Sequence, residues 1–328
     1  MESNYSLPIG WHVGKYELTG VLSHQNFFTT YRAYDPRLKL EVAIKELAPL
    51  ECTTRTADGR TIVLKEAAYA QWFDGMKERF LETGRVLCRF HHSSILSYRD
   101  VVEENGTACL VSRFVEGTTL EEWLCKNGAP GEGKLCIILH NLLTALHYGH
   151  QSGSLHNAIT PQNILMEHPT GMPVLTGFAN KTIFRPHKIT LLTPNSEWYP
   201  TPYDPSEQSS NSEMPGPWSD LYALGGVLYR AVTGRNPTTA IERACEDIPL
   251  SLPVLSSHKG YSPAFIAMIE KAMQSRAEDR WQSAAEWLRA LDRHTSTLAA
   301  TPSRLRRAVS AMLGLGRSPN NATATSSR

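Results

Sequence analysis

The sequence lacks several features that would assign it to a common functional class. No apolar run approaches the ~20 residues needed to cross a bilayer. The first residues, MESNYSLPIGW, lack the basic-then-apolar profile of a signal peptide. Neither charge is in excess, since 33 Lys and Arg stand against 32 Asp and Glu. We therefore expect a soluble, cytoplasmic protein that does not bind nucleic acid.

The cysteines form no recognisable metal or disulfide motif. They are scattered, without a C-x-x-C pair and without a histidine at metal-ligand spacing. We interpret them as reduced thiols of a cytosolic protein and predict no metal site. The six are Cys52, Cys88, Cys109, Cys125, Cys136 and Cys245. Hydrophobic residues make up 41% of the 328 residues, so the chain can bury a sizeable core.

Acidic residues are almost absent from the middle of the chain. Between Gly133 and Ser196 the only Asp or Glu is Glu167, which falls at a predicted turn and is interpreted as a solvated turn residue. The stretch 154–179, SLHNAITPQNILMEHPTGMPVLTGFA, contains two short apolar runs around a Pro/Gly turn. This pattern predicts a loop that leads into a two-stranded hairpin.

The same stretch resembles the catalytic core of a protein kinase, in which H-R-D-x-K-P-x-N precedes D-F-G. His156 and Asn163 match the first and last positions of the loop pattern. Other residues hold the positions of the loop Arg, Asp and Lys and of the metal-binding Asp. These altered positions are Asn157, Ala158, Thr160 and Gly177.

The altered positions carry the chemistry of phosphoryl transfer. One Asp orients the attacking hydroxyl, and a second holds the magnesium ions. Ala158 can neither accept a proton nor orient a substrate, and Gly177 has no side chain to bind Mg²⁺, so no Mg²⁺ site is expected. Asn157 replaces the Arg that would grip a phosphate on the activation loop. Switching by phosphorylation of that loop is therefore not expected.

Two strands joined by a tight loop are predicted over 16–34, and by resemblance they are the nucleotide loop of a kinase. The three glycines of G-x-G-x-x-G fall on Ser23, Gln25 and Phe28. Side chains at these positions should lift or occlude the loop, because glycine lets backbone amides approach the phosphates. Phe27 and Phe28 are interpreted as packing residues.

Residues 42–46, VAIKE, match the kinase strand whose lysine, here Lys45, contacts the nucleotide phosphates and a Glu on the following helix. That helix is predicted over 76–90. The Glu position falls on Thr83, and Glu82 is one residue away, a shift that turns a side chain by about 100°. The implied ion pair with Lys45 is therefore not a firm expectation.

Residues 108–117 predict a strand that ends in a Gly turn and resemble the hinge between kinase lobes. Ser112 falls at the position that gates the back of the nucleotide pocket, and its small side chain would leave the pocket open. Helices are predicted over 119–125 and 134–151. The nucleotide contacts implied by the resemblance are Leu22, Ala43, Lys45, Ser112, Asn163 and Leu165.

The segment 180–214 is rich in Pro, Ser, Thr and Asn and is expected to be an activation loop. Its end, 203–208, resembles the P-x-E-Q ending of that loop in bacterial kinases. The strongest single match follows in 216–225, GPWSDLYALG, which predicts a cap and a buried helix with an internal Asp.

The resemblance assigns a structural role to several residues of the large lobe. It implies that Asp220 braces the loop backbone at His156, and that Glu207 pairs with Arg280. Such residues hold the lobe together, so they support the fold and say nothing about turnover. The structural set is His156, Glu207, Asp220, Gly225 and Arg280.

The chain contains no Asp or Glu after Asp292, and its tail is basic and expected to be mostly disordered. Within the tail, 303–313 has the pattern of a short amphipathic helix. A membrane surface, a partner protein and docking on its own lobe are the alternatives for this segment. The expected divisions are an extension (1–15), a small lobe (16–111), a hinge with a large lobe (112–292) and the tail (293–328).

The ordered motifs identify the chain as a degenerate member of the bacterial serine/threonine protein kinase family. The resemblance implies an α+β, bilobal fold with a small β-rich lobe and a larger, mainly helical lobe. It also implies a pseudokinase that acts as a scaffold or allosteric regulator, with another protein as partner. No cofactor is required, and nucleotide binding without metal stays open. The alternative is a kinase-fold enzyme with residual or atypical ATP-dependent phosphotransfer or nucleotidyl transfer.

Overall fold

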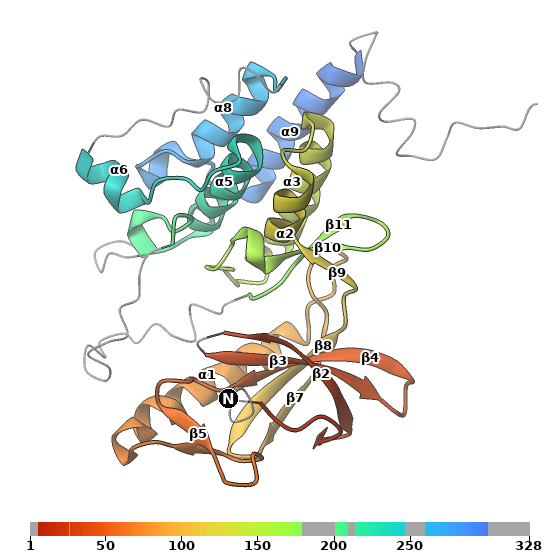
Figure 1. Ribbon diagram of the computed structural model, residues 1–328. Helices are drawn as coiled ribbons and strands as arrows, with labels where there is room; N and C mark the ends of the chain where they lie inside the picture. The colour runs from red at the N-terminus through yellow and green to blue at the C-terminus, as the bar shows by residue number, and fades with distance from the viewer. Residues whose placement is uncertain (1–5, 26, 179–200, 209–213, 247–259, 301–328) are drawn as a thin grey trace, which may run out of the picture.

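The computed structural model describes residues 6–25, 27–178, 201–208, 214–246 and 260–300. Over these ranges the chain forms two lobes, a small one built mainly of strands and a larger one built mainly of helices (Figure 1). The α+β, bilobal architecture expected from the sequence is confirmed. No helix in these ranges is long and apolar enough to cross a membrane.

A six-stranded antiparallel sheet forms the small lobe, in the order β1-β2-β3-β4-β8-β7. Its strands are His12–Val13 (β1), Tyr16–His24 (β2), Phe28–Asp35 (β3), Leu40–Leu47 (β4), Tyr98–Glu104 (β7) and Thr107–Arg113 (β8). The hairpin predicted over 16–34 is therefore present as β2 and β3. Because side chains alternate along a strand, Lys45 and Glu46 face opposite sides of the sheet.

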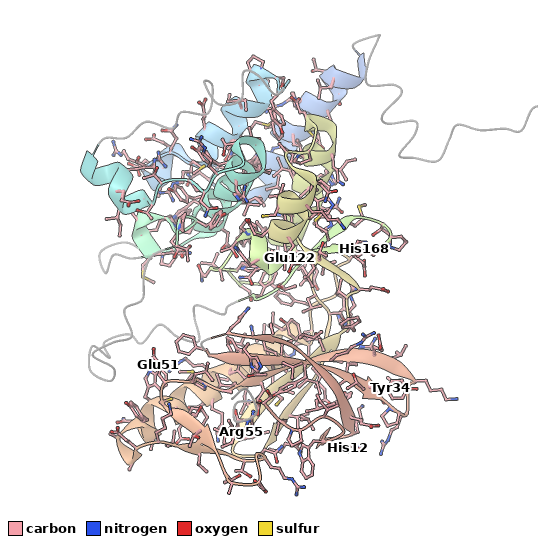
Figure 2. The ribbon with its side chains drawn as sticks, viewed as in Figure 1. His12, Tyr34, Glu51, Arg55, Glu122 and His168 are labelled. Carbon is pink, nitrogen blue, oxygen red and sulfur yellow. The ribbon has the colours of Figure 1, made fainter. Side chains whose placement is uncertain are left out.

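The outer face of this sheet is covered by the N-terminal segment of the chain. Leu7 and Val13 are buried there in an apolar cluster with residues of the sheet. Beside this cluster Glu46 and Arg55 form a buried ion pair, and the Tyr31 hydroxyl donates to the same carboxylate at 2.7 Å. Figure 2 labels Arg55 within the small lobe. The Leu7 N–H donates to the Tyr31 hydroxyl at 2.9 Å, which fixes the segment in place.

Between β4 and the first helix the chain makes a second, two-stranded sheet, Thr53–Arg55 (β5) and Ile62–Leu64 (β6). A 3₁₀ turn, Ala67–Tyr69, then leads into α1, Ala70–Leu87. The helix predicted over 76–90 thus begins at Ala70 and ends at Leu87. α1 packs against β7 and β8 and buries an apolar stripe beneath the sheet.

Helices build the large lobe. They are Leu120–Asn127 (α2), Glu132–Gln151 (α3), Pro217–Thr233 (α5), Ala240–Glu246 (α6), Pro263–Ala272 (α8) and Ala284–Ala300 (α9). The helices predicted over 119–125 and 134–151 are present as α2 and α3. Residues 293–300, the first part of the tail that is expected to be mostly disordered, continue α9. Residues 179–200, 209–213 and 303–313, with most of the expected activation loop, lie outside the described residues.

A three-stranded sheet lies where the two lobes meet, in the order β11-β10-β9. Its strands are Gly117–Thr119 (β9), Ile164–Glu167 (β10) and Met172–Leu175 (β11). The predicted hairpin is therefore confirmed. The interpretation of Glu167 as a solvated turn residue is wrong, because Glu167 is half-buried at the end of β10 and forms an ion pair with Arg113 at the end of β8.

Candidate functional site

The loop at residues 154–163 is fixed by hydrogen bonds to Asp220 of α5, which is fully buried. One oxygen of Asp220 accepts the His156 N–H at 2.8 Å, and the other accepts the Asn157 N–H at 2.7 Å. Nε2 of His150 lies 2.8 Å from the same carboxylate. Burial raises the pKa of Asp220, but these histidine and backbone contacts outweigh it and hold the pKa below its ordinary value. The brace implied for Asp220 is confirmed.

Asn157 turns the loop so that both amides reach this carboxylate. Its φ is +60°, the left-handed region, which asparagine tolerates better than most residues. The Gln208 amide donates to the Asn157 side-chain oxygen at 3.4 Å. The residue at the position of the loop Arg therefore contacts the end of the activation segment through a neutral hydrogen bond.

The loop positions that hold catalytic residues in the family pattern take part here in contacts within the loop. Ala158 is buried, and its carbonyl accepts the side-chain N–H of Asn163 at 2.7 Å. Thr160 is half-buried and precedes the 3₁₀ turn Pro161–Asn163. None of these side chains carries a carboxylate, so the loop offers neither a proton acceptor of that kind nor an anionic metal ligand.

Gly177 and Phe178 stand where the metal-binding motif would be. Gly177 has a φ of +79°. Burial raises the pKa of the neighbouring Tyr98 hydroxyl to about 12, and the backbone of Gly177 opposes that rise. Phe178 is buried, with its ring 4.5 Å from the ring of His156 and 5.6 Å, edge to face, from that of Phe90. The motif is therefore docked into the core by its aromatic residue.

On the small-lobe side of the site, the Phe28 ring contacts Lys45 and Phe80. Phe28, at the third glycine position, lies on the same face of the sheet as Lys45, two residues along the β3–β4 register. The Lys45 ammonium lies 3.9 Å from the centre of the Phe28 ring, and the ring packs 5.5 Å from that of Phe80 in α1. Burial lowers the pKa of Lys45 to about 8.

α1 places no carboxylate at the expected position. Thr83 is half-buried, whereas Glu82 is exposed to solvent. The turn of about 100° per residue explains this arrangement, because neighbouring helix positions face different directions. The helix thus presents a hydroxyl on its partly buried side and the charge of Glu82 to water.

Of the remaining residues expected to contact a nucleotide, only some lie close together. Ala43 and Ser112 are opposite each other in the β4–β8 register, close to Lys45. The buried Ser112 hydroxyl donates to the carbonyl of Arg113 at 3.2 Å. Leu165 is half-buried in β10, and Leu22 in β2 is 46% exposed. The structure therefore brings Ala43 and Ser112 close to Lys45, whereas Leu22 lies at an exposed position of β2.

Glu207 and Arg280 form a fully buried ion pair at 2.6 Å in the large lobe. The Ser219 hydroxyl donates to the same carboxylate at 2.7 Å, and the Arg280 guanidinium also donates to two backbone carbonyls. The pairing implied by the resemblance is confirmed. Gly225 lies in the middle of α5, where this helix approaches Ala272 closely.

Two contacts of the site had no signal in the sequence. His150 supports Asp220 from α3, and Gln208 donates to Asn157. Each joins segments that are distant along the chain. Only the folded arrangement brings them together.

A cavity of about 270 Å³ lies elsewhere, in the large lobe. It is lined by Ser206, Tyr222 and Arg243 together with residues 275–278. Volume alone would make it a candidate site. The residues matching the kinase motifs of the interlobe cleft do not line it, so we assign no role to it.

Residues 50–290 match the family model of the protein kinase domain. The chain is 28% identical over 270 residues to the serine/threonine-protein kinase PrkC of Bacillus subtilis (strain 168), which covers 81% of this chain and 38% of PrkC. It is 25% identical over 283 residues to PknB of Mycobacterium leprae (strain TN), with 83% and 42% covered. The chain thus spans about two fifths of the length of these relatives.

Solved structures give the same result. The structure described as the PpkA-294 apo form has a TM-score of 0.75 and 30% sequence identity, and it covers 88% of this chain and 99% of its own. The kinase domain of M. tuberculosis PknI has a TM-score of 0.65 at 20% identity, with 89% and 100% covered, and shows the fold alone. The chain therefore belongs to the protein kinase domain family, with similarity to its bacterial serine/threonine kinases.

Proposed function

We propose that this protein is a pseudokinase that acts as a scaffold or allosteric regulator in bacterial signalling. The observation that carries the proposal is the position of Phe28. Its ring packs on the Lys45 ammonium, the group that the family pattern directs at nucleotide phosphates. A cation–π contact satisfies part of that positive charge without a phosphate.

The residues of the loop support the same conclusion. Ala158 has no group to accept the proton of an attacking hydroxyl, and Gly177 has none to hold a metal ion. Each such loss removes stabilisation that acts in the transition state, where every ~1.4 kcal/mol is a factor of ten in rate. Losing both leaves little turnover, even when the effects are not additive.

A scaffold needs a well-defined surface, and the braces of the large lobe support one. Asp220 fixes the loop, and the buried pair of Glu207 and Arg280 fixes the end of the activation segment. We propose another protein as the partner and no required cofactor. Cytoplasmic placement is supported by five of the six cysteines, Cys52, Cys88, Cys109, Cys125 and Cys136, which are free thiols.

Thermal unfolding with millimolar ATP, in Mg²⁺ and in a chelator, tests the proposal. A ligand that binds the folded state raises the midpoint by mass action. We expect no shift for the native sequence and a shift for Phe28→Gly that disappears when Lys45→Met is added. Phe27→Gly is the matched control and should show no shift.

Phe28→Leu gives a second variant that leaves a smaller cavity, should Phe28→Gly be too unstable to purify. Direct binding of a fluorescent ATP analogue then reports the same gain. A Mg²⁺-dependent shift in the native sequence, together with phosphate transfer, would overturn the proposal and favour the enzyme.

A further inference from the structure

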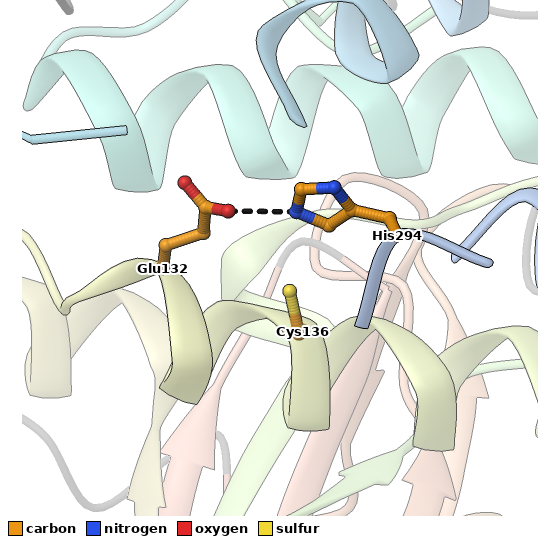
Figure 3. Close-up of side chains that lie close together, drawn as sticks. All are labelled: Glu132, Cys136 and His294. Atoms are coloured by element: carbon orange, nitrogen blue, oxygen red, sulfur yellow. Dashed lines mark hydrogen bonds and ion pairs between the residues drawn. The ribbon is translucent and has the colours of Figure 1, made fainter. Parts of the chain in front are cut away.

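A cluster of three potential metal ligands lies in the large lobe, away from the interlobe cleft. Glu132 and Cys136 are one turn apart on α3, and His294 belongs to α9 (Figure 3). One donor atom from each residue lies within 4.8 Å of the other two. Cys136 is 5% exposed, and the side chains of Glu132 and His294 are 11% and 8% exposed.

The donors are a carboxylate oxygen, an imidazole nitrogen and a thiol sulfur. This mixed set suits Zn²⁺, which binds all three types in proteins, and does not suit Mg²⁺ or Ca²⁺, which take oxygen ligands. Zn²⁺ with one thiolate, one carboxylate and a neutral imidazole has no net charge. Such a site can be buried without leaving an uncompensated ion.

Both carboxylate oxygens of Glu132 have hydrogen-bond partners, and Oε1 is the oxygen that contacts His294. Oε2 of Glu132 accepts the Ser262 N–H at the start of α8. Oε1 lies 2.7 Å from Nε2 of His294 and 3.0 Å from the Ser262 hydroxyl. A metal would take the place of the hydrogen shared by Oε1 and Nε2, while Oε2 kept its contact with α8.

We propose that Glu132, Cys136 and His294 form a zinc site that ties α9 to α3, with water or the Ser262 hydroxyl as the fourth ligand. On binding, the Cys136 S–H proton passes to solvent and a sulfur–zinc bond forms. The hydrogen that Nε2 of His294 shares with Glu132 leaves this nitrogen through solvent, and the neutral imidazole then binds zinc through the Nε2 lone pair with its one ring hydrogen on Nδ1. No oxidation or reduction is involved.

The metal-free contacts explain why the cluster is stable without zinc. The link between Glu132 and His294 joins residues that are 162 positions apart. Zinc would therefore strengthen a contact between α3 and the last described helix, whether or not the protein is a pseudokinase.

The test is a metal titration of the tag-free full chain after treatment with a chelator. Co²⁺ should give one saturable thiolate-to-cobalt charge-transfer band that one equivalent of Zn²⁺ abolishes. Zn²⁺ at about 100 times its Kd should raise the unfolding midpoint by about 5 °C. Absence of both the band and the shift would overturn the proposal and leave a helix clamp made only of hydrogen bonds.

Variants separate this site from adventitious binding. Cys136→Ala should abolish the band, and His294→Gln, which can still donate to Glu132, should weaken zinc binding at least tenfold. Cys125→Ser removes an exposed cysteine elsewhere and should change neither readout. A band that persists in Cys136→Ala, or is lost in Cys125→Ser, would place the metal elsewhere and overturn the proposal.

Discussion

The two lobes differ in which residues of the family pattern they keep. The large-lobe side of the interlobe region is called the floor here, and the small-lobe side is called the roof. In the floor, the structural polar groups of the family pattern are present and satisfied, as in the buried pair of Glu207 and Arg280, although Ala158 and Gly177 replace its two catalytic acids. In the roof, the glycine position of the nucleotide loop holds Phe28, and the helix Glu position holds Thr83. The polar residues that the floor keeps hold the backbone in place, whereas the family residues that the chain lacks would act only in phosphoryl transfer.

This difference teaches which residues the fold itself needs. Removing a floor residue leaves a buried charge or buried amides without partners, which raises the free energy of the folded state. Replacing a catalytic acid on the cleft surface has no such cost. A kinase fold can therefore lose its chemistry while keeping its structure.

The largest expected effect is on the buried ion pair of the floor. Arg280→Leu leaves the Glu207 carboxylate buried without its partner and should lower the free energy of unfolding by about 3–5 kcal/mol. Urea unfolding measures this difference. Arg276→Leu is the control, since Arg276 is 75% exposed and pairs with Glu278 on the surface. An equal loss in both variants would contradict the distinction between floor and surface.

The roof gives a smaller, pH-dependent effect through Lys45. Burial lowers its folded-state pKa to about 8, from an ordinary value of 10.5. The folded protein then binds fewer protons than the unfolded chain between these values, so the free energy of unfolding rises with pH across this window. The rise should be on the order of 2–3 kcal/mol.

Lys45→Met should remove this rise, and Lys77→Met in α1 should retain it. Urea unfolding at about pH 7.5 and about pH 10 measures both, and other titrating groups cancel when each variant is compared with the native sequence. The same rise in Lys45→Met as in the native sequence would show that the roof does not bury this amine.

Helix packing in the floor gives an effect of similar or smaller size. A methyl group added at Gly225 would lie 2.8 Å from Cβ of Ala272 and 2.8 Å from Cγ of Met273. Gly225→Ala should therefore cost about 1–3 kcal/mol in thermal or urea unfolding. Gly133→Ala in α3, which has no neighbour within 4 Å, should instead stabilise by about 0.5–1 kcal/mol. A stabilising Gly225→Ala would contradict the close approach of α5 and α8.

The smallest expected effect comes from restoring the acids alone. The double variant Ala158→Asp with Gly177→Asp regains both carboxylates, but Phe28 still packs on Lys45. Transfer of labelled phosphate from ATP should stay at the level of the native sequence. Phosphate transfer by the double variant would show that nucleotide binds even while Phe28 packs on Lys45, and would contradict this prediction.

Local motifs made most of the fold predictable. The β2–β3 hairpin, the strand containing Lys45, the hairpin after Asn163 and the helix containing Asp220 are each encoded by a short run of residues. The amino acids of such a run decide turn, strand or cap with little help from the rest of the chain. Their order then identified the bilobal architecture.

Contacts between distant segments could not be predicted in the same way. The ion pair of Glu167 has no signal in the sequence, because its partner Arg113 is 54 residues away. The start of α1 at Ala70 and the β5–β6 hairpin fall in a stretch that no kinase motif covers. The sequence indicated that Phe28 would crowd the nucleotide loop. That its ring meets Lys45 depends on the register of β3 against β4.

The N-terminal segment has a practical consequence for any recombinant fragment. Leu7 and Val13 are at most 2% exposed and cover the outer face of the small-lobe sheet. A fragment starting at Tyr16, where the kinase-like pattern begins, would expose that apolar face to water and leave the Tyr31 hydroxyl without its backbone donor. It would be prone to aggregation, so an expression boundary must be set upstream of Leu7.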